Sequence, residues 1–74
     1  MATYRVTATL LERYGAFHVT VVAMSDDRAA GVICREHLCD SREQANAVMD
    51  ILLDQVKEAV AAVGGVIERP EISS

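Results

Sequence analysis

The sequence predicts an α+β fold of order β-β-β-α, in which a three-stranded antiparallel sheet, with room for a short fourth strand, carries one long helix packed on one face. Residues 3–10 alternate between apolar and polar side chains, and residues 16–24 and 30–39 each divide into two rows of which one is expected to face the core, as in half-buried strands. Residues 42–63 instead repeat apolar side chains every three or four positions, as amphipathic helices do. The length of 74 residues predicts a single domain, residues 1–74, with a thin core.

The first two strands are predicted at residues 3–11 and 16–24, with residues 11–15 connecting them. Gly15 is free to adopt the positive φ that a tight turn needs. Polar residues 25–28 predict the next turn. Alternation assigns one row of side chains in each strand to the core. The expected inward residues are Tyr4, Val6, Ala8, Leu10, Phe17, Val19, Val21 and Ala23.

A third strand is predicted at residues 30–39, where the two rows of side chains differ less in polarity. We expect Val32, Cys34 and Leu38 to point inward. Their row also contains Glu36, which predicts that the strand lies at a sheet edge or carries a β-bulge. The residues expected to point outward are Ile33, Arg35, His37 and Cys39.

The helix is predicted over about residues 42–63. Two pairs before and within its first turn are spaced as capping boxes: Asp40 with Glu43, and Ser41 with Gln44. The apolar stripe that we expect to cover the sheet consists of Ala45, Val48, Met49, Leu52, Val56, Ala59, Val60 and Val63.

The last part of the chain is predicted to hold a short strand or a tail, residues 66–74. Gly64 and Gly65 follow the apolar stripe directly and predict the C-cap of the helix. Residues 66–68 are suited to a short fourth strand, which Pro70 would end.

The net charge of −4 is unevenly distributed. Residues 1–39 carry four arginines and four acidic residues, whereas residues 40–74 carry seven acidic and three basic residues. The excess of acid therefore lies in the predicted helix and tail. Because a nucleic-acid backbone binds basic surfaces, nucleic acid is not the expected partner. No apolar stretch approaches the 18 residues of a membrane span, so no membrane association is expected.

The two cysteines indicate a cytoplasmic location. Cys34 and Cys39 fall in one predicted strand, where their odd spacing sends them to opposite faces, so a disulfide between them is not expected. Reduced thiols are typical of the cytoplasm. The N-terminal residues also lack the pattern of a signal peptide.

The residues with metal-binding or nucleophilic side chains do not form a recognisable site. Cys34, His37, Cys39 and Asp40 lie within seven residues, and His18 belongs to the neighbouring strand. Zinc requires four converging ligands, and the strand turns Cys34 away from His37 and Cys39. We therefore expect no metal, no cofactor and no catalytic residue. The alternative hypothesis is a small-molecule or metal-binding domain that uses the expected outward side chains of His18, His37 and Cys39.

The leading functional hypothesis is a non-enzymatic protein-interaction module, namely a cytoplasmic regulator or inhibitor that binds another protein. On the helix, Asp50, Asp54 and Glu58 follow one another at i, i+4 spacing and would form an acidic surface for a basic partner. A charged helix face that merely keeps the protein in solution is the simpler interpretation.

The uncovered face of the sheet is a second predicted interaction surface. It would carry Val22, Met24 and Ile33, and we expect these residues to mediate self-association into a homodimer. A third hypothesis is RNA binding through the same face with Arg5 and Arg35. It ranks last because sheet-based RNA readers use exposed aromatic residues, and none is expected there.

The predicted strands followed by residues 40–45, of sequence Asp-Ser-Arg-Glu-Gln-Ala, resemble antitoxins of the HicB type, over the middle of the chain. The Pro-Asp-x-x-Gly turn of those antitoxins is absent. In size, acidity and element order the chain is also similar to small phage-encoded inhibitors such as anti-CRISPR proteins. Both resemblances imply a protein that binds a partner, and neither assigns a role to a residue.

Overall fold

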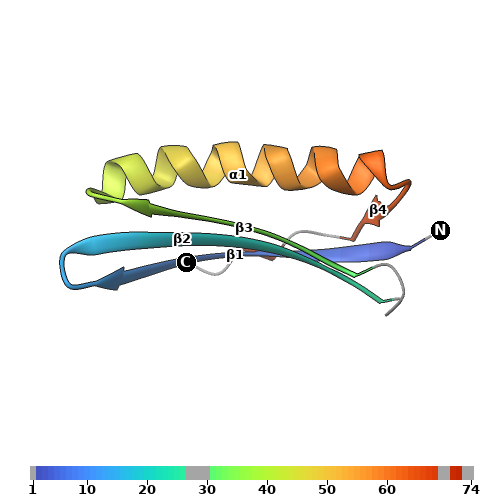
Figure 1. The fold of residues 1–74 in the computed structure, drawn as a ribbon, viewed down its shortest axis with the longest axis horizontal. Helices are drawn as coiled ribbons and strands as arrows, with labels where there is room; N and C mark the ends of the chain where they lie inside the picture. The colour runs from blue at the N-terminus through green and yellow to red at the C-terminus, as the bar shows by residue number, and fades with distance from the viewer. Residues whose placement is uncertain (1, 27–30, 69–70, 73–74) are drawn as a thin grey trace.

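One mixed sheet, built on three antiparallel strands, and one long helix form two layers in the computed structural model, which describes residues 2–26, 31–68 and 71–72 (Figure 1). The predicted α+β fold class is confirmed. The predicted features at residues 27–28, 30, 70 and 73–74 lie outside the described residues. The elements are β1 (Thr3–Arg13), β2 (Ala16–Ser25), β3 (Val32–Cys39), α1 (Arg42–Ala62), β4 (Val66–Ile67) and β5 (Glu71–Ile72).

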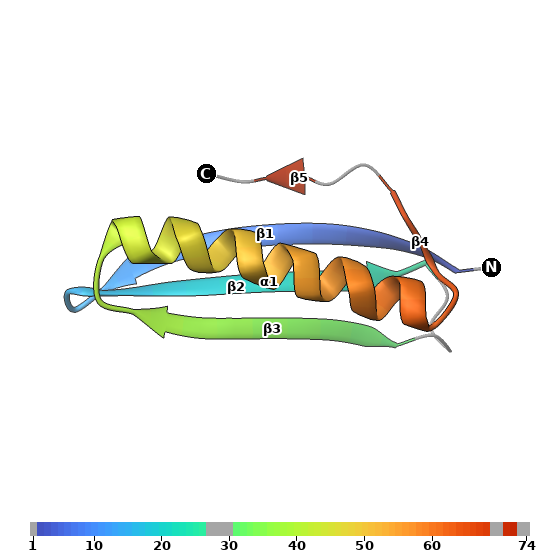
Figure 2. The same ribbon diagram turned by 90° about the horizontal axis from the view of Figure 1, so that it is seen from above.

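The strands lie in the order β3-β2-β1-β4, and β5 also pairs with β1. β2 is antiparallel to both β1 and β3, whereas β4 and β5 run parallel to β1. Viewed from above, α1 lies along the strands, and β4 and β5 flank β1 on the side away from β3 (Figure 2). Among the described strands, β3 therefore has a free edge. The helix leads from this edge of the sheet to the opposite edge, where β4 pairs with β1.

A two-residue turn joins β1 to β2, which is shorter than the predicted connection over residues 11–15. Tyr14 and Gly15 both have positive φ, 53° and 77°, as in the type I′ turns that suit twisted hairpins. The strands extend up to this turn, where Arg13 pairs with Ala16. The prediction of a positive φ at Gly15 is confirmed.

The core lies between α1 and one face of the sheet, as predicted for β1 and β2. Tyr4, Val6 and Ala8 are buried from β1, and Val19, Val21 and Ala23 are buried from β2. The helix contributes Ala45, Leu52, Val56 and Val60. Leu10, Phe17, Ile33, Val48, Met49 and Leu53 pack around this cluster.

Both ends of α1 are closed by hydrogen bonds. At the start, Oγ of Ser41 accepts from the backbone N–H of Gln44 at 3.1 Å, and Oε1 of Gln44 accepts from the N–H of Asp40 at 3.2 Å. Of the two predicted caps, Ser41 is therefore the N-cap. At the end, Gly64 has φ 74° and the N–H of Gly65 donates to the carbonyl of Val60 at 2.9 Å. This Schellman arrangement confirms the predicted glycine cap.

The side chains of β3 point to the sheet faces opposite to those predicted. It pairs Ile33 with Ala23 and Cys39 with Phe17, and residues paired in this way point to the same face. The row facing α1 is therefore Ile33, Arg35, His37 and Cys39. The prediction that Val32, Cys34 and Leu38 point inward is wrong. β3 does lie at the edge, and its pairing with β2 runs without interruption from Val32 to Cys39.

The length of the charged side chains explains this orientation. A one-residue change of register exchanges all inward and outward side chains of a strand. With the predicted orientation, the short carboxylate of Glu36 would lie on the side of α1. In the observed one, Arg35 and His37 are exposed beside the helix, and a long arginine stem reaches water easily from there. The guanidinium of Arg35 also donates to the carbonyl of Cys34 at 2.9 Å.

Candidate interaction surface

The face of the sheet opposite α1 is the candidate functional surface, and we call it the open face. Figure 1 shows the helix on the other side of the sheet. The register of β1, β2 and β3 arranges the open face in rows that cross the strands. These rows are Arg5–Met24–Val32, Thr7–Val22–Cys34, Thr9–Thr20–Glu36 and Leu11–His18–Leu38.

Large apolar side chains are exposed on the open face. The exposed fractions are 51% for Leu11, 58% for Met24, 60% for Val32 and 66% for Leu38. An antiparallel sheet with one wet face normally turns polar residues to that side. β3 departs from this rule, because Val32 and Leu38 point away from the helix whereas Arg35 and His37 point to its side. The open face therefore carries apolar surface that a solvated face does not require.

The charged groups of the open face lie toward its margins. Arg5, near one end of β1, has its Nε 3.9 Å from a carboxylate oxygen of Glu68. Nε2 of His18 lies 3.3 Å from a carboxylate oxygen of Glu36, which belongs to the edge strand. Uncharged residues fill the row between these pairs, where Thr7, Val22 and Cys34 lie side by side. An uncharged centre with a charged margin is the usual anatomy of a protein interface.

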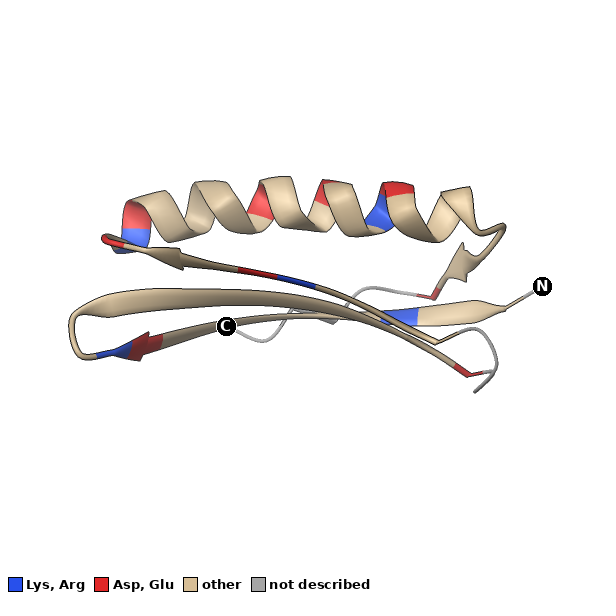
Figure 3. Cartoon of the chain, viewed as in Figure 1, with Lys and Arg blue, Asp and Glu red and all other residues tan. Residues whose placement is uncertain are grey.

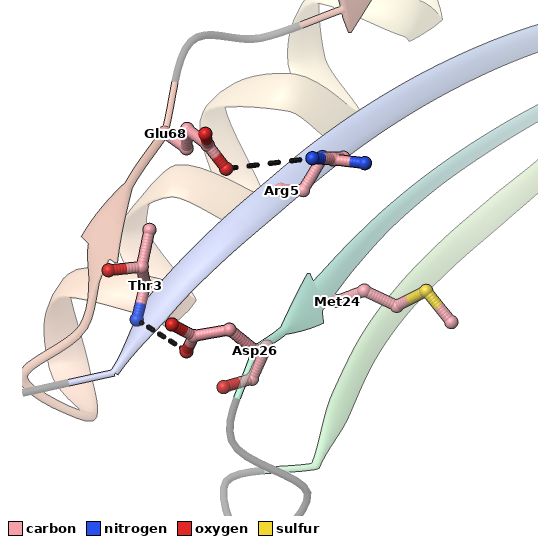
Figure 4. Close-up of a pocket in the computed structure, with 6 residues that line it drawn as sticks. Thr3, Arg5, Met24, Asp26 and Glu68 are labelled. Carbon is pink, nitrogen blue, oxygen red and sulfur yellow. Dashed lines mark hydrogen bonds and ion pairs between the residues drawn. The ribbon is translucent and has the colours of Figure 1, made fainter.

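Two hollows mark opposite ends of the open face. The first has a volume of about 260 Å³ and is bounded by Arg5, Met24 and Glu68, together with a pair of hydrogen bonds between Thr3 and Asp26 of 3.0 and 3.2 Å (Figure 4). The second, of about 330 Å³, lies beside the hairpin turn. It is lined by Leu11, Arg13, Tyr14, Ala16, His18 and Leu38. Both hollows offer space for side chains of a bound protein.

Two of the three residues predicted for the open face lie on it. Val22 and Met24 are there, but Ile33 points to the helix side and packs against the core. The positions that the prediction missed on this face are Leu11, Val32, Cys34 and Leu38. The predicted inward row places a charged residue, Glu36, on the core side. This unfavourable position is the signal in the sequence that the two rows of β3 are exchanged.

The acidic set of α1, Asp50, Asp54 and Glu58, is exposed on the helix side of the molecule (Figure 3). These side chains therefore lie on the layer opposite the open face. Their exposure to solvent agrees with the expectation that they form an acidic surface on the helix. Their role in contacting a partner stays a prediction.

The residues of the metal-binding hypothesis do not converge. His18 lies on the open face, whereas His37 and Cys39 face the helix side, so the prediction of a shared outer face is wrong. Cys39 is buried and Cys34 is exposed, the reverse of the expected assignment. Among the side chains described in residues 2–26 and 31–68, no three of His, Cys, Asp or Glu gather as a metal site.

The RNA-binding hypothesis also loses one of its two residues. Arg5 lies on the open face, and Arg35 lies on the side of the helix. Only one of the two arginines could therefore contact a strand bound to the open face.

No family model matches the chain, and neither a curated protein nor a solved structure is significantly similar to it. The resemblances to HicB-type antitoxins and to phage-encoded inhibitors therefore stay hypotheses. In the described part of the chain, no helix has both the length and the apolar character needed to cross a membrane.

Proposed function

We propose that this chain is a non-enzymatic protein-interaction module that uses the open face as its binding surface. The observation that supports this function is the orientation of β3. Val32 and Leu38 point away from the helix, while Arg35 and His37 occupy the side on which burial is available. A folded chain gains stability when such apolar side chains are covered, and a bound protein would cover them.

The apolar surface is large enough to matter for binding. At their exposed fractions, Leu11, Met24, Val32 and Leu38 present roughly 400 Å² of accessible surface. This area is divided between two groups, Met24 with Val32 at one end of the face and Leu11 with Leu38 at the other. Burying about 400 Å² contributes roughly 10 kcal/mol before costs. Association costs about 4–15 kcal/mol, so the apolar residues need further contacts from the margin of the face.

The role of such a module is to occupy a surface of its partner, as a regulator or inhibitor does. The charged margin would then fix the orientation of the complex, because complementary charges add specificity more than affinity. The small-molecule and metal alternative has less support, since His18 is on the face opposite His37 and Cys39.

Affinity capture with a pair of matched variants tests this function. Leu38→Asp places a charge on the open face, and Ile51→Asp places the same charge on α1, at a residue that is 55% exposed. We expect the wild-type protein and Ile51→Asp to retain a bound protein, either another chain or a second copy, and Leu38→Asp to lose it. The proposal fails if the wild type binds nothing, or if Leu38→Asp retains the same partner.

A further inference from the structure

We infer that the occupant of the open face is a second copy of this chain, which packs face to face to give four layers: helix, sheet, sheet and helix. This inference rests on the proposed function and names the partner. The observations that favour a second copy are the size of the face, its charge, and the way its rows match themselves under two-fold symmetry.

The size of the face fits a small dimer interface. Ten residues at roughly 3.4 Å each and three strands at roughly 4.8 Å give a flat footprint of about 480 Å². The accessible surface follows the side chains and is larger than this flat area. A standard interface takes about 800 Å² from each partner, and obligate complexes take considerably more. The open face therefore suits a dimer at the lower end of interface sizes, which would still supplement the thin core of a small domain.

The charge distribution permits this dimer. On and beside the open face, the two arginines Arg5 and Arg13 are matched by the two acids Glu36 and Glu68, so the face does not select a strongly charged protein. The acidic residues of α1 lie on the other layer (Figure 3). Face-to-face packing would hold the two helices apart by the thickness of both sheets, since stacked sheets alone are about 10 Å apart. This separation exceeds the Debye length of about 8 Å, so the helices would scarcely repel each other.

The rows of the face determine the direction of the two-fold axis. An axis across the strands would reverse the four rows, so that Arg5 lies over the partner's Leu11 and Met24 lies over its His18, which places apolar side chains against polar ones. An axis parallel to the strands instead places β1 over the partner's β3 and β2 over its own copy. Leu11 then lies against the partner's Leu38, and Val22 and Met24 meet their own copies. In this arrangement each contact is made twice, as two-fold symmetry requires.

Pairing through the free edge of β3 is the competing dimer, and the structure disfavours it. Charged side chains that point inward on an edge strand hinder edge pairing, and Arg35 occupies such a position. Its guanidinium already binds the carbonyl of Cys34. An antiparallel pairing centred on Arg35 would also place the two copies of this arginine directly opposite each other.

The exposed thiol of Cys34 distinguishes the two dimers. Cys34 points to the open face from the row Thr7–Val22–Cys34, while Cys39 is buried, so native protein offers one accessible thiol. The experiment measures mass by light scattering and the labelling rate of Cys34 with a thiol reagent over a range of protein concentrations. We expect twice the monomer mass at high concentration, together with labelling at least tenfold slower than in dilute protein.

Variants complete the test. Leu38→Asp and Met24→Asp should be monomeric and should label at the dilute rate throughout, whereas Ile51→Asp should behave like the wild type. Either open-face variant serves alone if the other does not fold. A dimer whose Cys34 labels as fast as in the monomer overturns the inference, because it leaves the open face uncovered. A monomer at all concentrations also overturns it, and the proposed function then stands only if another protein is captured in a manner that depends on Leu38.

Discussion

Gly65 lies against the ring of Tyr4 so closely that a Cβ atom at this position would be 2.5 Å from Cε1 of the tyrosine. Such a Cβ would also lie 3.0 Å from Cγ1 of Val60. This approach brings the chain from the end of α1 down to β1, where the N–H of Val66 donates to the carbonyl of Ala2 at 2.9 Å. The absence of a side chain at residue 65 thus permits β4 to join the sheet.

Gly65→Ala is therefore expected to destabilise the fold by about 1–3 kcal/mol, because the new methyl group overpacks a site between buried residues. Gly64→Ala is the control. A Cβ atom on Gly64 would meet nothing within 4 Å, so only its left-handed backbone, with φ 74°, opposes alanine, at a cost of about 1 kcal/mol. Urea denaturation gives both free energies of unfolding. A Gly65→Ala protein as stable as the wild type would refute the close packing.

Ser41→Ala is expected to lower the free energy of unfolding by about 1 kcal/mol, because the first turn of α1 loses the hydrogen bond from Gln44 to the serine hydroxyl. Asp40→Ala is the control, since the structure uses only the backbone N–H of Asp40 in the cap. Its effect should be smaller and limited to a charge near the helix start. A larger loss from Asp40→Ala than from Ser41→Ala, measured by urea denaturation, would reverse the assignment of the cap.

The orientation of β3 predicts different reactivity for the two cysteines. In dilute native protein, Cys34 should react with a thiol reagent at least about a hundredfold faster than Cys39, which is buried and must wait for an opening of the structure. Cys34→Ser should abolish the fast reaction, and Cys39→Ser should preserve it. A fast reaction that survives in Cys34→Ser would show that β3 has the opposite faces to those described.

Sequence patterns determine β1, β2 and α1 because each has one row or stripe that is clearly the more apolar. In β1, for example, Val6 and Ala8 alternate with Thr7 and Thr9, so only one orientation buries apolar residues. In β3 both rows mix apolar and charged residues, so the orientation of the strand depends on which charged side chains can reach water. Their access to water depends on the position of α1 relative to the edge strand, and the alternation of residues does not encode that position.

The candidate surface is only partly predictable for the same reason. The positions of Val22 and Met24 on the open face follow from the row pattern of β2. The prediction assigns Ile33 to the open face because the orientation predicted for β3 is wrong. The pattern places Leu11 in a connection, because two adjacent leucines interrupt the alternation and conceal the continuation of β1 to Arg13. The parallel pairing of β4 and β5 with β1 brings residues far apart in the chain together, which no local pattern could indicate.

The acidic set of α1 predicts a charge change that stabilises the protein. Asp54 lies four residues from both Asp50 and Glu58, so Asp54→Lys replaces two repulsive pairs by two attractive ones, while its i, i+3 pair with Lys57 becomes repulsive. Each change of pair is worth roughly 0.4–1 kcal/mol at low salt, so a net gain of roughly 0.4–1 kcal/mol in the free energy of unfolding is expected. Urea denaturation in low and in high salt measures the gain, which screening should largely remove in high salt.

Glu43→Lys makes the same change of net charge, from −4 to −2, in the first turn of α1. There the acid interacts favourably with the helix dipole, so its replacement by lysine should cost about 0.5–1 kcal/mol. Opposite signs for Asp54→Lys and Glu43→Lys would show that local charge geometry governs stability. If both variants gained equally, the reduction in total charge would be the cause, and repulsion within the acidic set would not be.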